Sequence, residues 1–226
     1  DPEAAIGELE WALEKGARLF CMRPAAVFDQ RRAWSPADPR FDGFWARVSE
    51  AGVTAVIHAG DSGYSSQGYA NDAFSADFSG SGYRFSVRAW GMERAAEDFL
   101  ATLVFDRLFE RFPGVRVASV ENGSQFLPDL FRKLESAGKK SRSYFKEPPE
   151  ETFKRHVWIN PFWEDDVHEI LSFMGPDRVI FGSDWPHIEG MPHPLDYESE
   201  LSRFDEATKA KIMRENALEL NQRRPA

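Results

Sequence analysis

The chain contains 226 residues, 42% of them hydrophobic, which is enough for one sizeable core or for two small domains in close contact. Its 28 Lys and Arg against 37 Asp and Glu give a formal net charge of −9, which argues against nucleic acid and membrane surfaces as main partners. No apolar run reaches the roughly 18 residues of a bilayer-spanning helix, and the first residues lack the layout of a secretion signal. The single cysteine, Cys21, can form no internal disulfide. We therefore expect a cytoplasmic protein.

Residues 1–16 predict a helix. Asp1 is a good N-cap, Pro2 suits the first helical turn, and Gly16 is typical of a helix end. The chain therefore begins directly on a helix cap, without an initiator methionine. We take this as a sign that it continues a longer polypeptide.

Short apolar runs, rich in β-branched and aromatic residues, alternate with helical patterns along the rest of the chain. The runs are mostly too continuous for half-exposed strands, so they predict buried parallel strands at 17–22, 53–58, 115–120, 156–160 and 178–183. Apolar residues at helical spacing predict helices within 39–52, 93–114, 125–138, 166–175 and 206–220. This alternation is typical of an α/β protein with a parallel sheet and right-handed crossovers.

Two architectures fit this pattern equally well. Five strands can form an open flavodoxin-like sheet, or they can be the last five strands of a (β/α)₈ barrel, which needs about 250 residues. No glycine-rich phosphate loop follows the first predicted strand, which weakens the nucleotide-binding form of the open sheet.

Residues 59–92 form a long segment without a clear periodic pattern. A loop of this length after a strand usually serves a function or is disordered. Its aromatic residues indicate packing, either as a structural or subunit contact or as a lid over a substrate. They are Tyr64, Tyr69, Phe74, Phe78, Tyr83, Phe85 and Trp90.

Polar side chains follow the predicted strands, where parallel α/β folds carry out their chemistry. They are Arg23, His58, Glu121 with Asn122, Asn160, and Asp184 with His187. His156 is expected to open its strand and therefore to lie at the opposite edge, and His168 is expected to be solvated on a helix.

Each of these signals has an ordinary structural explanation when taken singly. A histidine that ends a buried strand is more often a hydrogen-bonded structural residue than a ligand, and an aspartate after a strand often caps the next helix. Capping does not explain Asp184, because three prolines in WPHIEGMPHPLDY delay the next helix to around Leu195. We therefore expect the Asp184 carboxylate to face the mouth of the sheet.

His58 and Asp184 together suggest a metal site. A neutral imidazole and a carboxylate are ligands suited to Zn²⁺ or Mn²⁺. Two protein ligands rarely make a tight site, and Glu121 is the only further candidate at a strand end. The remaining ligands are therefore expected upstream, unless the site is incomplete.

Several stretches in their order resemble the amidohydrolase-related branch of the amidohydrolase superfamily, which includes the aminocarboxymuconate-semialdehyde decarboxylase-like enzymes. They are VIHAG, FPGVRVASVENGSQFLPDLFRKL, VWINPFWED, RVIFGSDWPHIEG and RENALEL. The resemblance implies a (β/α)₈ TIM-barrel-type fold that binds one divalent ion or two at its C-terminal face. It implies His58 and Asp184 as the ligands from the fifth and eighth strands, and Asp184 as a catalytic residue.

The family's H-x-H pair from the first strand has no counterpart in this sequence. By the same resemblance, residues 17–22 are the fourth strand, so residues 1–226 would be a single domain, the C-terminal part of a barrel with an insertion at 59–92. A second departure is Glu121, which stands where the family's decarboxylases have a catalytic histidine. We expect Glu121 to carry protons there or to act as a further ligand.

The resemblance implies an enzyme that hydrolyses or decarboxylates a small carboxylated substrate, for which an aromatic carboxylate is one option. It also implies one divalent ion, with zinc expected in preference to manganese. Substrate contacts are expected from Arg23, Asn160, Trp185 and His187. A loop salt bridge is the structural alternative for Arg23, and stabilising the turn is the alternative for His187. The expected macromolecular partner is a second copy or a missing N-terminal segment of the same polypeptide. The alternative is a non-catalytic module that binds a partner through residues 59–92.

Overall fold

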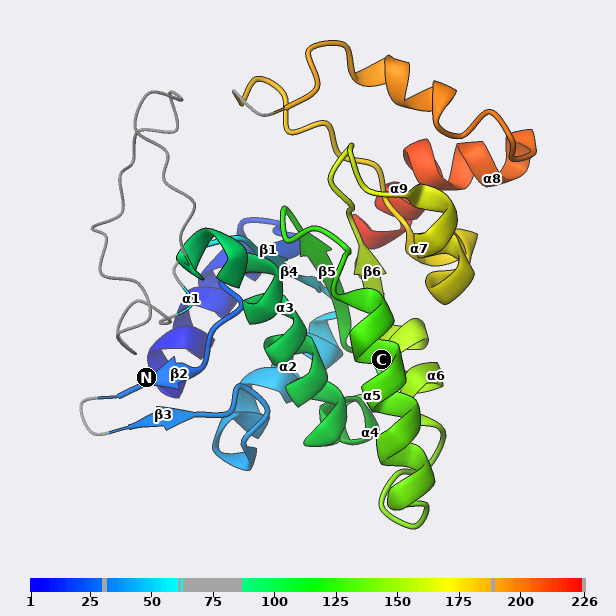
Figure 1. The fold of residues 1–226 in the computed structure, drawn as a ribbon. Coiled ribbons are helices and arrows are strands. Elements are labelled where there is room, and N and C mark those ends of the chain that lie inside the picture. The colour runs from blue at the N-terminus through cyan, green and yellow to red at the C-terminus, as the bar shows by residue number, and fades with distance from the viewer. Residues whose placement is uncertain (30–31, 61, 63–86, 188–189, 225–226) are drawn as a thin grey trace.

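The structure, a computed structural model, describes residues 1–29, 32–60, 62, 87–187 and 190–224, with only the backbone of 87–93 (Figure 1). No helix of this described part has an apolar stretch long enough to cross a bilayer. The side chains of all seven aromatic residues predicted to pack within 59–92 lie outside the described part of the structure.

A parallel sheet forms the centre of the described chain. Its strands are β1 (Leu19–Met22), β4 (Thr54–His58), β5 (Arg116–Val120) and β6 (Val157–Ile159), in the spatial order β1-β4-β5-β6. Strands that follow one another in the chain are therefore neighbours. A flavodoxin-like sheet reverses its strand order at a switch point, whereas a TIM-type barrel does not. The observed order is that of the barrel alternative.

The predicted strand at 178–183 is wrong except at one position. Val179 makes an isolated parallel bridge with Ile159, and the Ile180 N–H donates to the Ile159 carbonyl over 2.9 Å. The next N–H, that of Phe181, donates to the carbonyl of Ile212 over 2.9 Å instead. The backbone thus leaves the sheet after Ile180, which frees the following residues to form an irregular loop.

The predicted helices form, with changes at their boundaries. They are α1 (Pro2–Glu14), α2 (Asp42–Ala51), α3 (Val87–Phe105), α4 (Leu108–Arg111), α5 (Leu127–Lys140) and α7 (Val167–Met174), followed by α8 (Glu206–Ala210) and α9 (Asn216–Leu220), which are joined by a π-helical turn (Lys211–Glu215). Asp1 caps α1 by accepting from the N–H of Glu3 over 3.0 Å, as expected. The long helix predicted within 93–114 is divided because Arg107 adopts a left-handed conformation with φ 58°.

Three elements differ from the prediction. The hairpin of β2 (Val27–Phe28) and β3 (Ala33–Trp34) was not predicted, since each strand is only a few residues long. The helix α6 (Pro149–His156) was not predicted either, and it includes His156, which was expected to open β6. Residues 87–92, predicted to be irregular, begin α3. Short 3₁₀ turns lie at Pro39–Phe41, Pro176–Arg178 and Pro194–Ser199.

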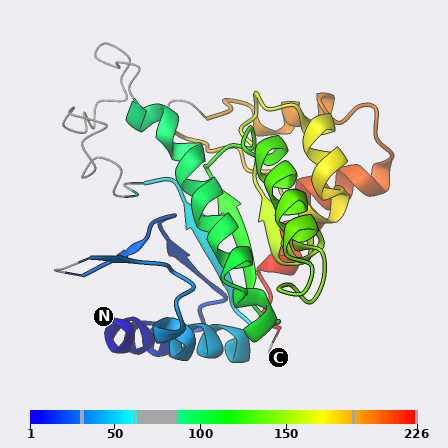
Figure 2. The ribbon, with the colours of Figure 1, turned by 60° about the horizontal axis from the view of Figure 1, so that its bottom comes forward.

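Alternate residues of the strands pack into two separate apolar clusters, as expected for a sheet buried on both faces. The larger cluster lies under the helices, and Figure 2 shows α3 and α5 side by side on this face. The smaller cluster, on the opposite face, contains Ala118, Trp158, Ile180 and Leu220. This second face is less covered at β1, where Leu19 and Cys21 are exposed.

The C-terminal segment crosses the amino ends of the strands. The buried guanidinium of Arg116 donates to the carbonyls of Gly52 over 2.7 Å and Gln222 over 2.6 Å, and the Thr54 hydroxyl donates to the Leu220 carbonyl over 2.7 Å. Burial lowers the pKa of Arg116. These bonds fix one end of the sheet and leave its carboxyl edge as the open one.

His156 gives this fold a predicted dependence on pH. The ring is buried, stacks on Phe109 with 4.4 Å between centroids, and donates from Nδ1 to the Val115 carbonyl over 2.8 Å. Desolvation lowers the pKa of His156 below its ordinary value of 6.5. Between the lowered pKa and 6.5 the unfolded chain binds a proton that the folded chain does not, so the free energy of unfolding falls as the pH falls through that window.

We expect urea unfolding to show this loss between pH 7.5 and pH 5.5, with a contribution from His156 of at most about 1.4 kcal/mol per pH unit. His156→Asn keeps a donor for the Val115 carbonyl and removes the titrating ring. The variant should therefore lose less stability on acidification than the wild type does. Equal losses in the two proteins would show that His156 is not the group responsible.

Candidate metal and proton-transfer site

Two of the predicted site residues, His58 and Glu121, meet at the carboxyl edge of the sheet. His58 ends β4 and Glu121 follows β5, and the two strands are paired up to His58 and Val120. The Nε2 atom of His58 lies 2.7 Å from Oε2 of Glu121. Nδ1 of His58 lies 3.0 Å from the Ala59 carbonyl, which can only accept, so Nδ1 carries a proton. The Nε2–Oε2 contact thus joins the imidazole of His58 directly to the carboxylate of Glu121.

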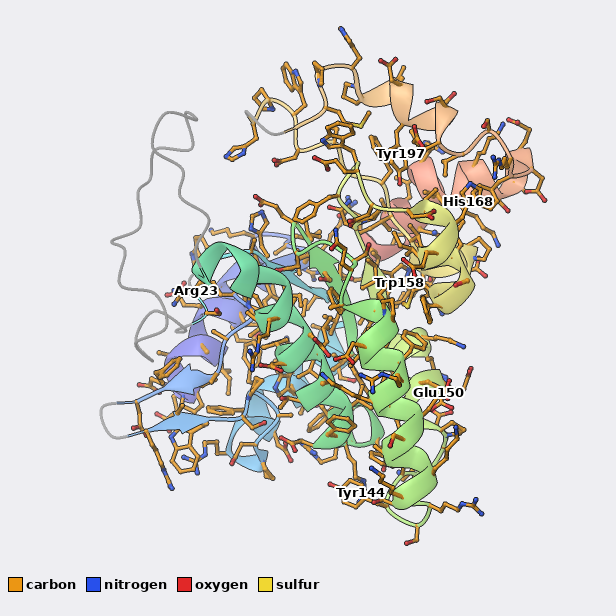
Figure 3. All side chains as sticks on the ribbon, viewed as in Figure 1. Arg23, Tyr144, Glu150, Trp158, His168 and Tyr197 are labelled. Carbon is orange, nitrogen blue, oxygen red and sulfur yellow. The ribbon has the colours of Figure 1, made fainter. Side chains whose placement is uncertain are left out.

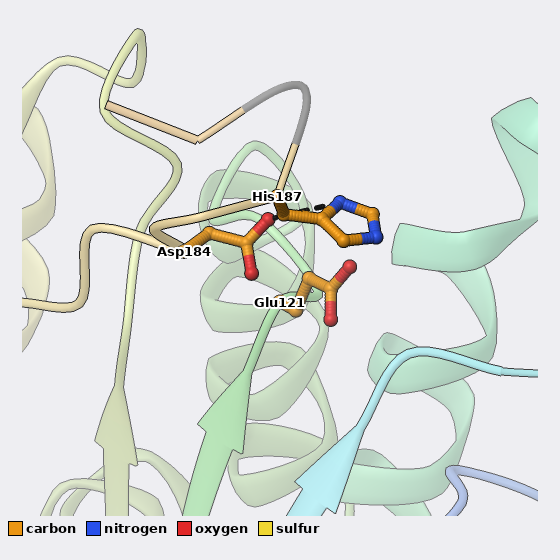
Figure 4. Close-up of side chains that lie close together, drawn as sticks. All are labelled: Glu121, Asp184 and His187. Carbon is orange, nitrogen blue, oxygen red and sulfur yellow. Dashed lines mark ion pairs between the residues drawn. The ribbon is translucent and has the colours of Figure 1, made fainter. Parts of the chain in front are cut away.

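Asp184 and His187 add a second imidazole and a second carboxylate. Oδ2 of Asp184 lies 3.4 Å from Nδ1 of His187. Within the described residues, Glu121, Asp184 and His187 form a group whose potential ligand atoms all lie within 4.8 Å of one another (Figure 4). His58 lies outside this group and contacts it through Glu121. The structure thus brings His58 and Asp184 to the same edge, with Glu121 next to both.

A closed loop explains how Asp184 and His187 come together. The N–H of His187 donates to the Asp184 carbonyl over 2.8 Å, and the N–H of Met191 donates back to the Ser183 carbonyl over 2.8 Å. Gly190 lies so close to this turn that a Cβ atom there would collide with the Asp184 carbonyl oxygen. Only glycine fits at this position without displacing the Asp184 backbone.

Gly190→Ala should therefore damage the site without touching a side chain in it. We expect the protein to lose about 1–3 kcal/mol of stability by overpacking, and its affinity for a divalent ion to fall at least about 10-fold. Thermal unfolding and calorimetric titration with Mn²⁺ measure the two effects. Gly7→Ala is the matched control, since nothing lies within 4 Å of its new Cβ and alanine favours the helix there. Unchanged ion binding in Gly190→Ala would contradict this account of the loop.

Both carboxylates lie on strained backbone. In the described chain, the non-glycine residues with positive φ are Arg107, Glu121 at 56° and Asp184 at 55°. A left-handed conformation costs a residue other than glycine roughly 1–3 kcal/mol and persists only where the surroundings enforce it. Such strain is concentrated at functional sites. Two of these three residues are the carboxylates of the candidate site.

The other predicted contact residues differ in their surroundings. Arg23 is exposed after β1 (Figure 3). A Cβ atom on Gly60 would be 3.2 Å from the side-chain carbons of Arg23, so Arg23 lies against the start of the loop after His58. Within the described part of the chain, no acid is paired with its guanidinium. Trp185 is 65% exposed beside Asp184. Asn160 is buried and donates to the carbonyls of Pro161 and Ile180 over 3.2 and 3.3 Å, so its amide N–H groups already have backbone partners.

The donor geometry fits a divalent ion. Two ligand atoms on a tetrahedral Zn²⁺ with bonds of about 2.0–2.1 Å are roughly 3.3 Å apart. The Asp184 and His187 atoms are 3.4 Å apart. Their positions three residues apart in one tight turn are a signal that was present in the sequence, although His187 was predicted to contact substrate or to stabilise the turn and not to be a ligand.

Comparison with known proteins identifies the family. A family model described as amidohydrolase matches residues 1–220. The chain belongs to the amidohydrolase family. The resemblance inferred from its motifs is therefore confirmed, and so is the TIM-barrel type of fold.

This amidohydrolase is 36% identical to a solved amidohydrolase from Mycobacterium avium subsp. paratuberculosis K-10, with a TM-score of 0.84 over 98% of this chain and 56% of the other. It is 26% identical over 144 residues to the 2-amino-3-carboxymuconate-6-semialdehyde decarboxylase of Dictyostelium discoideum, covering 58% of this chain and 38% of that protein.

A dihydroxybenzoic acid decarboxylase from Polaromonas sp. JS666, solved with bound manganese and the inhibitor 2-nitroresorcinol, shares the fold at 18% identity. Its TM-score is 0.72 over 98% of this chain and 66% of the other. The amidohydrolase chain thus spans about half to two thirds of the solved chains and just over a third of the Dictyostelium protein.

Proposed function

We propose that this amidohydrolase chain belongs to a metal-dependent carbon–carbon lyase that removes a carboxyl group from a small aromatic carboxylate. The observation that carries the proposal is the meeting of His58, Glu121, Asp184 and His187 at one edge of the sheet. The Dictyostelium and Polaromonas relatives are both named as decarboxylases, and this supports the reaction class.

Asp184 and His187, whose potential ligand atoms are 3.4 Å apart, would hold the ion. His58 would be the third ligand, since it supplies a second imidazole and contacts this group through Glu121. Zinc suits these ligands, and manganese is bound by the Polaromonas relative. A bound ion would supply Lewis acidity towards an oxygen of the substrate, which favours the electron-rich state formed as the carboxyl group leaves.

Arg23 and Glu121 would act on the substrate itself. Arg23 has its guanidinium exposed near the mouth and would pair with a substrate carboxylate. In the reaction, the bond between the ring carbon and the carboxyl carbon breaks, its electron pair stays on the ring carbon, and CO₂ leaves. Glu121 gives its proton to that carbon and forms the new C–H bond. The Glu121 side chain is 26% exposed, so it can recover a proton from solvent.

Hydrolysis is the second candidate, favoured by the 36% identity to a solved protein that is named an amidohydrolase. In that reaction Asp184 would accept a proton from the attacking water and pass it to the leaving group. The roles of His58 and His187 as ligands would be the same.

The described sheet would supply strands four to seven of the barrel, with Val179 marking the eighth. An apolar cavity of about 470 Å³ lies beside β1, lined among others by Trp11, Phe20, Cys21 and Trp45. The first three strands of the barrel would pair along the β1 edge, contributed by another part of the same polypeptide. A second copy of the chain is the other way to cover this edge.

Product analysis on the full-length protein tests the proposal. The protein, loaded with Mn²⁺ or Zn²⁺, is given a set of hydroxybenzoates and carboxylated phenols, and separately a set of amides and esters. We expect CO₂ release from an aromatic carboxylate, lost on chelation and restored by the ion. Hydrolysis of an amide or ester without CO₂ release would favour the second candidate. A protein that catalyses neither reaction and binds no ion would be the non-catalytic module.

A further inference from the structure

The buried side chain of Asn122 bridges the two strands that carry His58 and Glu121. Asn122 is 0% exposed. Its Nδ2 atom donates to the Ile57 carbonyl on β4 over 3.1 Å and to the Val120 carbonyl on β5 over 2.9 Å, and it lies 3.2 Å from the Ser119 hydroxyl. The regular pairing of β4 with β5 ends at His58 and Val120. The Asn122 amide therefore links the two strands at the point where their backbone pairing ends.

The two carbonyls belong to the peptide groups that lead directly into the site residues. The Ile57 carbonyl is part of the peptide unit before His58, and the Val120 carbonyl is part of the unit before Glu121. Holding both with one amide fixes the distance between the two backbones. The 2.7 Å contact between His58 Nε2 and Glu121 Oε2 joins the two residues that follow these carbonyls.

The same amide also accounts for the conformation of Glu121. The bond from Asn122 back to Val120 closes a ring around Glu121, which lies between them with φ 56°. Gly123, the next residue after Asn122, has φ 66° and completes the turn. Breaking the ring would let Glu121 relax from its left-handed conformation and turn its carboxylate away from His58.

We infer that Asn122 is a positioning residue that places Glu121 against His58 and so sets the geometry of the proton-transfer site. The consequence for the reaction rests on the proposed function, whereas the placement of Glu121 does not. If Asn122 only filled space or stabilised the sheet, its replacement would lower the stability of the protein. The His58–Glu121 contact would then stay as it is in a control variant of equal stability.

Asn216 offers a matched control. It is also a buried asparagine, and its Nδ2 donates to two carbonyls, those of Pro176 and Val179, over 2.8 Å each. It binds the last part of the chain to the residues near Pro176 and touches neither His58 nor Glu121. Asn122→Leu and Asn216→Leu therefore each remove a buried amide that donates to two backbone carbonyls, but at different places in the fold.

The experiment uses the full-length protein with ¹⁵N-labelled histidine. In the metal-free protein, a hydrogen bond between His58 and Glu121 should give a downfield ¹H resonance, assigned by its absence in His58→Gln. We expect this resonance to be lost in Asn122→Leu and kept in Asn216→Leu, although the Tm of both falls. Calorimetric titration with Zn²⁺ should show an affinity about 10- to 100-fold lower in Asn122→Leu and within two-fold of the wild type in Asn216→Leu.

A resonance and an affinity kept in Asn122→Leu would overturn the inference and leave Asn122 a structural residue only. If Asn122→Leu does not fold, Asn122→Ala takes its place with the same expected results. If the wild type binds neither Zn²⁺ nor Mn²⁺, the proposed function fails, and the resonance still decides the role of Asn122.

Discussion

Asp184→Asn is expected to abolish tight binding of a divalent ion by the full-length protein. The amide keeps the shape of the side chain, and asparagine tolerates the left-handed backbone as well as aspartate does, so the fold should persist. What is lost is the negative charge and a strong ligand next to His187. We expect the affinity for Mn²⁺ or Zn²⁺ to fall at least about 100-fold and kcat/KM to fall by about 10³ or more. Metal analysis after dialysis and steady-state kinetics measure the two losses.

Asp196→Asn is the matched control for this substitution. Asp196 lies in the same C-terminal region, in the turn Pro194–Ser199, and its side chain is outside the candidate site. The control should retain the ion and the activity. The thermal unfolding of metal-free Asp184→Asn should match that of the metal-free wild type within about 1 kcal/mol. If Asp184→Asn retained a stoichiometric ion, Asp184 would not be a ligand.

Glu121→Gln is expected to separate proton transfer from ion binding. Glutamine keeps a hydrogen bond to His58 but carries no proton that it can give to carbon. We expect kcat to fall by about 10²–10⁴, the usual contribution of a positioned acid, with the affinity for the ion within about three-fold of the wild type. Steady-state kinetics and calorimetric titration of the same preparation measure both quantities.

Glu121→His provides the control for this second prediction. Histidine tolerates positive φ better than most residues and can carry a proton. It should therefore recover part of the activity that Glu121→Gln loses. If Glu121→Gln instead lost the ion as completely as Asp184→Asn, Glu121 would be a ligand, and another group would have to supply the proton.

The sheet could be predicted because its strands are buried on both faces. Runs such as VTAVIH and VRVASV have no polar alternation, and this pattern excludes most other structures. Their order in space could not be read from periodicity, because the pattern is the same whether neighbours in the chain are neighbours in the sheet. The run at 178–183 looked equally strand-like, but the Phe181 N–H bonds to Ile212, which lies 31 residues later in the chain.

The site could be predicted in outline from the same rule. Polar residues after buried strands gather at one edge, and this rule predicts His58, Glu121 and Asp184 at the carboxyl edge of the sheet. The direct contact of His58 with Glu121 was not predictable, because it depends on the left-handed turn at Glu121. Nothing in the local sequence requires positive φ at a glutamate, and the cause lies in the bonds that Asn122 makes to two strands.

We expect His58, Asp184 and His187 to hold one divalent ion together. Crystals of the full-length protein soaked in Mn²⁺, with data collected at the manganese absorption edge, test it most directly. We expect one strong anomalous peak at about 2.0–2.2 Å from an Asp184 oxygen and from a nitrogen of each of the two imidazoles. A peak bound to other residues, or no peak at saturating Mn²⁺, would contradict it.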